Sequence, residues 1–149
     1  MNTTAKPPQM EAWEAVIRTV GSLLKTFEAE LQDAVGLPLP WYDVLVQLSS
    51  APDGRLRMQA LADSVVLSRS GLTRLIDRME KADLVEREHC ADDRRGYYAV
   101  LTEEGRRVFR GAKPVHEQGI YEHFTRHLDG GDARAVVAAF TKVRQGNRL

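Results

Sequence analysis

The fold of this chain is constrained most by an apolar helical pattern that leads directly into two short stretches of alternating residues. In residues 69–81, apolar side chains recur every three or four positions, which is typical of a helix with one buried face. Residues 84–90 and 96–101 have the pattern of two strands, with the charged turn 92–95 between them. A helix joined to a hairpin in so short a segment predicts a small sheet attached to a helical domain.

Helical patterns dominate the rest of the chain. A first helix is expected to end at about Val35, because Gly36 follows it, and a second helix to begin at Pro40. Further elements are predicted at residues 55–57 (a short strand), 59–64 (a helix) and 102–128 (a helix kinked or broken near Gly111 by Pro114), with a last helix after Gly130-Gly131. The predicted fold class is therefore mainly α with a small β-wing.

Length and composition indicate a folded globular chain. The 149 residues fit one domain, and the hydrophobic (43%) and charged (28%) fractions are ordinary for such a chain. The single cysteine, Cys90, excludes an intramolecular disulfide and fits a reducing cytoplasm. Residues 1–9 lack the apolar core of a signal peptide, and no apolar run is long enough to span a membrane. We therefore expect a cytoplasmic protein with no membrane partner.

The charge balance gives no overall attraction to nucleic acid. Lys and Arg total 21, as do Asp and Glu, and the basic and acidic residues between positions 69 and 95 also cancel. If this segment binds phosphate, its positive and negative side chains must therefore separate in space.

One segment, residues 67–81 with the sequence LSRSGLTRLIDRMEK, resembles the recognition helix of the MarR family of bacterial regulators. Residues 84–87 and 93–95 are similar to that family's wing, residues 101–105 to the start of its next helix, and residues 39–45 to its second helix. The similarity follows the family's order through nearly the whole chain. Asp83 is a departure, because members of the family often have glycine at this position.

The resemblance implies a sequence-specific, DNA-binding transcriptional regulator that acts as a homodimer. Residues 39–105 would form a winged helix-turn-helix lobe, and residues 10–36 and 106–146 would be dimerisation helices within one domain of residues 1–149. Each subunit would place one lobe on a pseudo-palindromic operator in double-stranded DNA, with half-sites about 34–36 Å apart. Repression by occluding a promoter, relieved by a small aromatic or anionic effector, is the expected mode.

Polar side chains at the start of the recognition helix suit directional hydrogen bonds to base edges and phosphates. The predicted DNA-binding residues are Ser68, Arg69, Ser70, Thr73, Arg74 and Arg78 on the helix and Arg94 and Arg95 at the hairpin tip. Ser68 is also expected to cap the helix, and Arg78 to contact a phosphate or an acidic side chain. Asp93 would orient the wing by pairing with a nearby arginine.

Trp41 and Tyr42 are candidates for an effector pocket, since relatives bind small aromatic acids between the dimer helices and the DNA-binding lobe. The preferred interpretation, however, places both side chains in the core or at the dimer interface. No catalytic constellation is present, because the glycines form no phosphate-binding loop and Ser68 has no histidine near it in sequence. We therefore predict no enzymatic activity.

His116, His123 and His127 follow one face of the predicted fifth helix, where two of them have a spacing that can hold a metal ion. The first two helices offer no His or Cys as further ligands, so a solvated or dimer-facing stripe is preferred and no cofactor is predicted. Cys90 has acidic neighbours that oppose thiolate formation and is interpreted as a structural strand residue. Two alternatives remain open: a winged-helix protein-interaction module, and a metal- or redox-gated variant of the same regulator.

Overall fold

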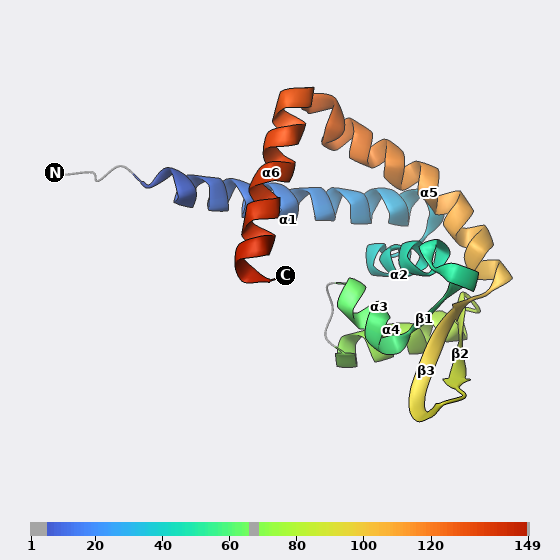
Figure 1. The fold of residues 1–149 in the computed structure, drawn as a ribbon. Coiled ribbons are helices and arrows are strands. Elements are labelled where there is room, and N and C mark those ends of the chain that lie inside the picture. The colour runs from blue at the N-terminus through green and yellow to red at the C-terminus, as the bar shows by residue number, and fades with distance from the viewer. Residues whose placement is uncertain (1–5, 66–68, 149) are drawn as a thin grey trace. The chain divides into compact units, whose positions relative to one another are not determined.

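The computed structural model describes the backbone of residues 6–65 and 69–148, and the side chains of the same residues except Arg69 and Ser70. The chain is mainly helical with one small sheet, as Figure 1 shows, so the predicted fold class is confirmed. It divides into two compact units, Met1–His116 and Glu117–Leu149. The single domain spanning residues 1–149 stays a prediction.

The first unit opens with two helices, α1 (Pro8–Val35) and α2 (Leu39–Ser50). The helix α1 ends where the sequence predicted, because Gly36 adopts the left-handed conformation with a φ of 65° and its N–H donates to the carbonyl of Gln32. The first N–H of α2 donates to the Glu28 carboxylate at 2.8 Å. This hydrogen bond ties the start of α2 to α1.

The helix-turn-helix consists of α3 (Met58–Ser64) and α4 (Arg69–Lys81). Residues 66–68 between them lie outside the described residues, and with them the predicted N-cap Ser68. The core of this lobe includes Val44, Leu45, Leu48, Leu61, Leu72, Leu75, Ile76 and Met79. Burial stabilises each such side chain by about 1.5–3 kcal/mol, so the apolar stripe of α4 fixes which of its faces points to solvent.

Three antiparallel strands form the sheet in the order β1-β3-β2. They are β1 (Arg55–Arg57), preceded by the 3₁₀ turn η1 (Pro52–Gly54), then β2 (Val85–Cys90) and β3 (Asp93–Leu101). Asp83 turns the chain from α4 into β2 in the left-handed conformation, with a φ of 62°. Its carbonyl accepts a hydrogen bond from the Thr102 hydroxyl at 2.5 Å, which joins the two ends of the hairpin.

The hairpin turn is shorter than the sequence predicted. Alternation placed the turn at residues 92–95, but β3 already begins at Asp93. The ladder is regular as far as the pair His89 and Tyr97, beyond which residues 94–96 bulge out of it. The prediction was wrong here because bulged residues break the two-residue period by which a strand is recognised.

The helix α5 (Glu103–His123) begins as predicted, since the Thr102 hydroxyl accepts a hydrogen bond from the N–H of Gly105 at 2.9 Å. The helix is continuous through Pro114, so the chain is not broken there. It ends at His123 rather than near residue 128, and the 3₁₀ turn η2 (Thr125–His127) follows.

The last helix, α6 (Gly130–Asn147), includes the two glycines that were expected to precede it. Asp129 caps it, because its carboxylate accepts from the N–H groups of Gly131 and Asp132 at 2.7 and 2.9 Å. The Asp132 carboxylate accepts in turn from the Asp129 N–H at 3.2 Å. This reciprocal capping box offsets the low helix propensity of glycine.

Two helices expose large apolar side chains. On α1 these are Met10, Trp13, Ile17, Val20 and Leu24, which are between 46% and 58% exposed. On α6, in the second unit, Val137, Phe140 and Val143 are 67%, 43% and 54% exposed. On each helix the spacing of three or four residues puts them on one face. Exposed apolar stripes of this kind are typical of interaction surfaces. Within the described residues, no helix combines the length and the apolarity needed to cross a membrane.

Candidate nucleic-acid interface

The solvent face of α4 carries side chains that the sequence assigned to DNA. Thr73, Arg74 and Arg78 are all exposed, opposite the buried stripe of the same helix. The side chains of Ser68, Arg69 and Ser70 lie outside the described part of the chain. A helix with hydroxyl and guanidinium groups on an open face can form directional hydrogen bonds with base edges.

Arg87 on β2 is hydrogen-bonded to α4 at several points. Its guanidinium lies 2.5 Å from the Asp77 carboxylate and 2.9 Å from the Glu80 carboxylate. It also donates to the carbonyl oxygen of Thr73 at 3.3 Å, and its backbone N–H donates to Glu80 at 3.2 Å. Hydrogen bonds between charged groups are about twice as strong as neutral ones. Arg87 therefore fixes α4 against the wing and compensates the negative charge of both acidic residues.

Sequence reasoning missed this role of Arg87 and counted it only as one charge in a neutral sum. The spacing of Asp77 and Glu80 could have indicated this role. It puts two acidic residues on one side of a helix that otherwise carries arginines. A helix of this kind needs a cation from a neighbouring element if it is to approach phosphate.

The outer face of the sheet pairs two further acidic residues with arginines of β1. Arg55 lies 3.0 Å from Glu88, and Arg57 lies 3.3 Å from Asp92. The Tyr98 ring lies beneath both guanidinium groups, and its centroid is 4.2 Å from the Cζ atom of Arg55 and 5.5 Å from the Cζ atom of Arg57. Exposed ion pairs contribute little to stability, but these connect the hairpin to β1 and compensate acidic residues near the tip.

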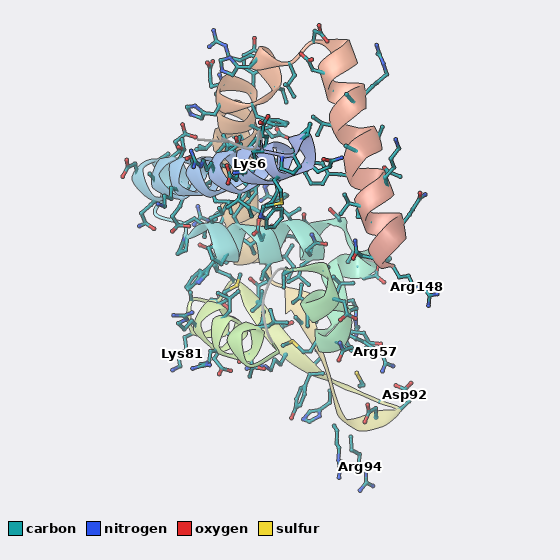
Figure 2. The ribbon with its side chains drawn as sticks, turned by 90° about the vertical axis from the view of Figure 1, so that its left-hand side faces the viewer. Lys6, Arg57, Lys81, Asp92, Arg94 and Arg148 are labelled. Atoms are coloured by element: carbon teal, nitrogen blue, oxygen red, sulfur yellow. The ribbon has the colours of Figure 1, made fainter. Side chains whose placement is uncertain are left out.

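The end of the hairpin presents two exposed arginines. Arg94 points away from the helices (Figure 2), and Arg95 follows it in the bulge. Within the part of the chain that the structure describes, neither forms an ion pair with an acidic side chain. Asp93 was expected to pair with an arginine side chain, but its carboxylate accepts from the backbone N–H of Arg95 at 3.0 Å.

A cavity of about 690 Å³ lies between the hairpin and the helix-turn-helix. Its walls come from α3, α4 and all three strands and include Thr73, Arg87, Arg95 and Tyr97. Because Thr73 and Arg95 line one space, the recognition helix and the hairpin present their polar groups to the same side of the lobe.

A second groove of about 950 Å³ lies between α4 and the start of α2. Trp41 lines it together with Arg74 and Arg78. Tyr42, which the sequence grouped with Trp41, is buried elsewhere, with its ring centroid 4.6 Å from that of His116. Neighbouring helix residues point about 100° apart, so adjacency in the sequence did not place the two rings in one pocket.

The histidines do not converge on a metal site. His116 packs against Phe27 and Tyr42, with ring centroids 5.1 and 4.6 Å away. His127 lies in η2, where its Nε2 is 3.0 Å from the carbonyl oxygen of Glu122, so the predicted common helix face is wrong for His127. Among the residues described, no group of three His, Cys, Asp or Glu side chains is arranged to hold a metal ion.

Cys90 closes β2 and is only 4% exposed. It is also one of the residues that line the cavity beside the hairpin. This burial agrees with its interpretation as a structural strand residue, since a reactive thiol needs access.

A helix-turn-helix with an open second helix, followed by an arginine-tipped hairpin, defines a winged-helix DNA-binding lobe. The sequence profile of the MarR family matches residues 35–96, which include all of this lobe except the end of β3. The chain is also 34% identical to the transcriptional regulator HosA of Escherichia coli O127:H6 over 117 residues, which is 78% of this chain and 82% of HosA. It therefore belongs to the MarR family.

Two solved structures from Streptomyces coelicolor are similar over nearly the whole chain. AbsC, a MarR family transcriptional regulator, is 35% identical, with a TM-score of 0.89 and coverage of 96% of both chains. Sco3205, a MarR family transcriptional regulator crystallised in complex with DNA, is 30% identical, with a TM-score of 0.88 and coverage of 95% of this chain and 89% of that chain. This protein is accordingly a DNA-binding transcriptional regulator and not an enzyme.

Proposed function

We propose that this protein is a sequence-specific repressor that binds a pseudo-palindromic operator as a homodimer and releases it on binding a small effector. The observation that carries the proposal is the joint exposure of Thr73 and Arg74 on α4 and of Arg94 and Arg95 at the hairpin tip. In this proposal α4 enters the major groove, and the hairpin meets the adjacent minor groove or its phosphates.

The first two turns of α4 and the residue that precedes this helix would read the bases. The residues proposed for this are Ser68, Arg69, Ser70, Thr73 and Arg74. A bidentate arginine–guanine contact discriminates against a wrong base by about 1–3 kcal/mol. Arg78, one turn further along, is proposed to contact phosphate, and Asp93 to shape the hairpin tip through its bond to the Arg95 N–H.

The exposed apolar stripes support a homodimer. Ile17 on α1 and Val137 on α6 are 52% and 67% exposed, and a second subunit would cover both helices. A two-fold dimer presents two recognition helices, which suits half-sites about 34–36 Å apart on one face of the duplex.

The groove beside Trp41 supports an effector site. Its lining combines an indole ring with the guanidinium groups of Arg74 and Arg78, which suits a small aromatic anion. Because the same arginines are proposed to contact DNA, effector and operator binding would oppose each other. If effector binding also changed the distance between the two DNA-binding lobes of the dimer, this change would weaken operator binding as well.

Selecting bound sequences from a random pool of duplexes tests the function directly. We expect an inverted repeat whose half-sites are about 10–10.5 base pairs apart. The double variant Arg69→Ala/Arg74→Ala should then lose the preference for this operator over random DNA, whereas Arg107→Ala, an exposed change on α5, should keep it. Full specificity in the double variant would show that these arginines do not read the operator.

Metal or redox gating of the same regulator is less well supported. The burial of Cys90 and the separate surroundings of His116 and His127 argue against it. Metal analysis of the purified protein and titration of the Cys90 thiol in the native state would reveal either kind of sensor.

A further inference from the structure

One face of the hairpin carries two aromatic rings that the DNA contacts proposed above do not use. His89 on β2 and Tyr97 on β3 are register partners, and their ring centroids lie 4.3 Å apart. Both side chains are exposed, Tyr97 by 37%. Two rings that pack on each other outside the core form a firm surface with an apolar body and polar ends.

Strand alternation places this pair on the side of the hairpin that faces α4. Residues two apart share a face, and Arg87, two residues before His89, is hydrogen-bonded to α4. Independently, Tyr97 lines the same cavity as Thr73 of the recognition helix. Tyr98, the next residue, lies on the opposite face, beneath the guanidinium groups of β1.

Along the hairpin, the pair lies between the two parts proposed to contact DNA. Arg87 holds α4 on one side of it, and the bulge with Arg95 and the exposed Arg94 begin on the other. Glu88, which separates Arg87 from His89 in the sequence, is paired with an arginine on the outer face. A duplex that reaches both α4 and the hairpin tip must therefore pass the pair. Of the acids near it, Glu88 is compensated on the outer face and Asp93 accepts the Arg95 N–H.

We infer that His89 and Tyr97 contact the DNA backbone between the major and the minor groove. The Tyr97 hydroxyl and an imidazole N–H of His89 donate to phosphate oxygens, and the rings pack against deoxyribose. Tyrosine is among the side chains that bind phosphates, and amphipathic rings suit a surface where apolar sugar adjoins charge. The inference rests on the proposed placement of α4 and the hairpin. Because every sequence has the same phosphates, the pair adds affinity and register rather than base preference.

Binding of the full-length protein to the selected operator and to a random duplex of equal length tests the pair. Tyr97→Phe removes one hydroxyl and should weaken binding to both duplexes about 3- to 10-fold, and His89→Ala/Tyr97→Ala about 10- to 50-fold. Tyr98→Phe is the matched control, since it removes the same group from the opposite face, and it should change affinity less than about twofold. Thermal unfolding of each variant separates lost contact from lost fold.

Replacing one operator phosphate at a time with a neutral methylphosphonate locates the phosphates that His89 and Tyr97 contact. Wild-type binding should weaken at one or two phosphates beside each half-site, and Tyr97→Phe should be insensitive at those positions while responding normally elsewhere. Two results together would show that the pair faces solvent. In the first, the double variant binds both duplexes as tightly as the wild type does, and in the second, Tyr97→Phe responds to each methylphosphonate as the wild type does. Loss of preference for the operator alone would also overturn the inference, since it would indicate a base contact. Failure of the wild type to select any sequence would instead refute the proposed function.

Discussion

Among individual side chains, Arg87 compensates the two acidic residues that α4 carries. The basic and acidic residues between positions 69 and 95 sum to zero, so their effect on DNA depends on which of them are compensated. Only 20% of the Arg87 side chain is exposed, and it contacts Asp77 and Glu80 together. The recognition helix can therefore approach phosphate although it contains two acidic residues.

Arg87→Met should weaken binding to operator and random duplexes alike, by about 10-fold or more, because two uncompensated carboxylates would face the phosphates. The lost contacts should also lower the free energy of unfolding by about 1–2 kcal/mol. Adding Asp77→Asn and Glu80→Gln should restore most of the affinity. Dissociation constants of the single and triple variants check this, and equal affinities for wild type and Arg87→Met would contradict it.

Arg78 differs from Arg74 in the kind of contact expected. Arg78→Ala should weaken binding uniformly across sequences and reduce the slope of log K against log salt by about 1, as loss of one phosphate contact does. Arg74→Ala should reduce the ratio of operator to random affinity. Salt titrations with both duplexes distinguish the two, and a change of preference in Arg78→Ala would show that this residue reads a base.

At the level of secondary structure, the junction between α4 and β2 sets where the hairpin begins. Asp83 holds this junction in the left-handed conformation, which costs a residue with a Cβ about 1 kcal/mol. Its backbone carbonyl, not its side chain, receives the hydrogen bond from Thr102. The departure from the family's glycine is therefore tolerated at a cost in stability, with the chain still turned into β2.

Asp83→Gly should raise the free energy of unfolding by about 0.5–1 kcal/mol, since relief of the backbone strain exceeds the entropy that glycine loses on folding. Gly36→Ala, at the left-handed end of α1, should have the opposite effect, a loss of about 1 kcal/mol. Urea denaturation of the two variants checks both signs. A less stable Asp83→Gly would mean that the aspartate side chain stabilises the junction.

For the molecule as a whole, the proposed homodimer depends on the exposed apolar stripes of α1 and α6. Ile17→Asp and Val137→Asp should each yield a monomer by light scattering, because a charge on either stripe opposes its burial. Operator affinity should then fall about 100-fold or more, since the second half-site is no longer bound at high effective concentration. Ser22→Asp, on another face of α1, is the control and should remain dimeric. A dimeric Ile17→Asp would remove this stripe from the interface.

The sequence alone determined the order and kind of the elements. Helix and strand periods are local, so the end of α1 at Gly36, the start of α5 at Thr102 and the wing after α4 could be predicted from neighbouring residues. The resemblance of residues 67–81 to a recognition helix also needed no coordinates. Local patterns failed at residues 94–96, where the bulge has no regular period.

Only the tertiary structure decided which groups meet. The contact of Arg87 with Asp77, the separation of Trp41 from Tyr42 and the pairing of His89 with Tyr97 depend on how helices and strands pack. The physical reason is that burial of an apolar stripe fixes the rotation of each element, and this rotation then places polar side chains that are distant in the chain. Periodicity within a segment carries no information about the element that will face it.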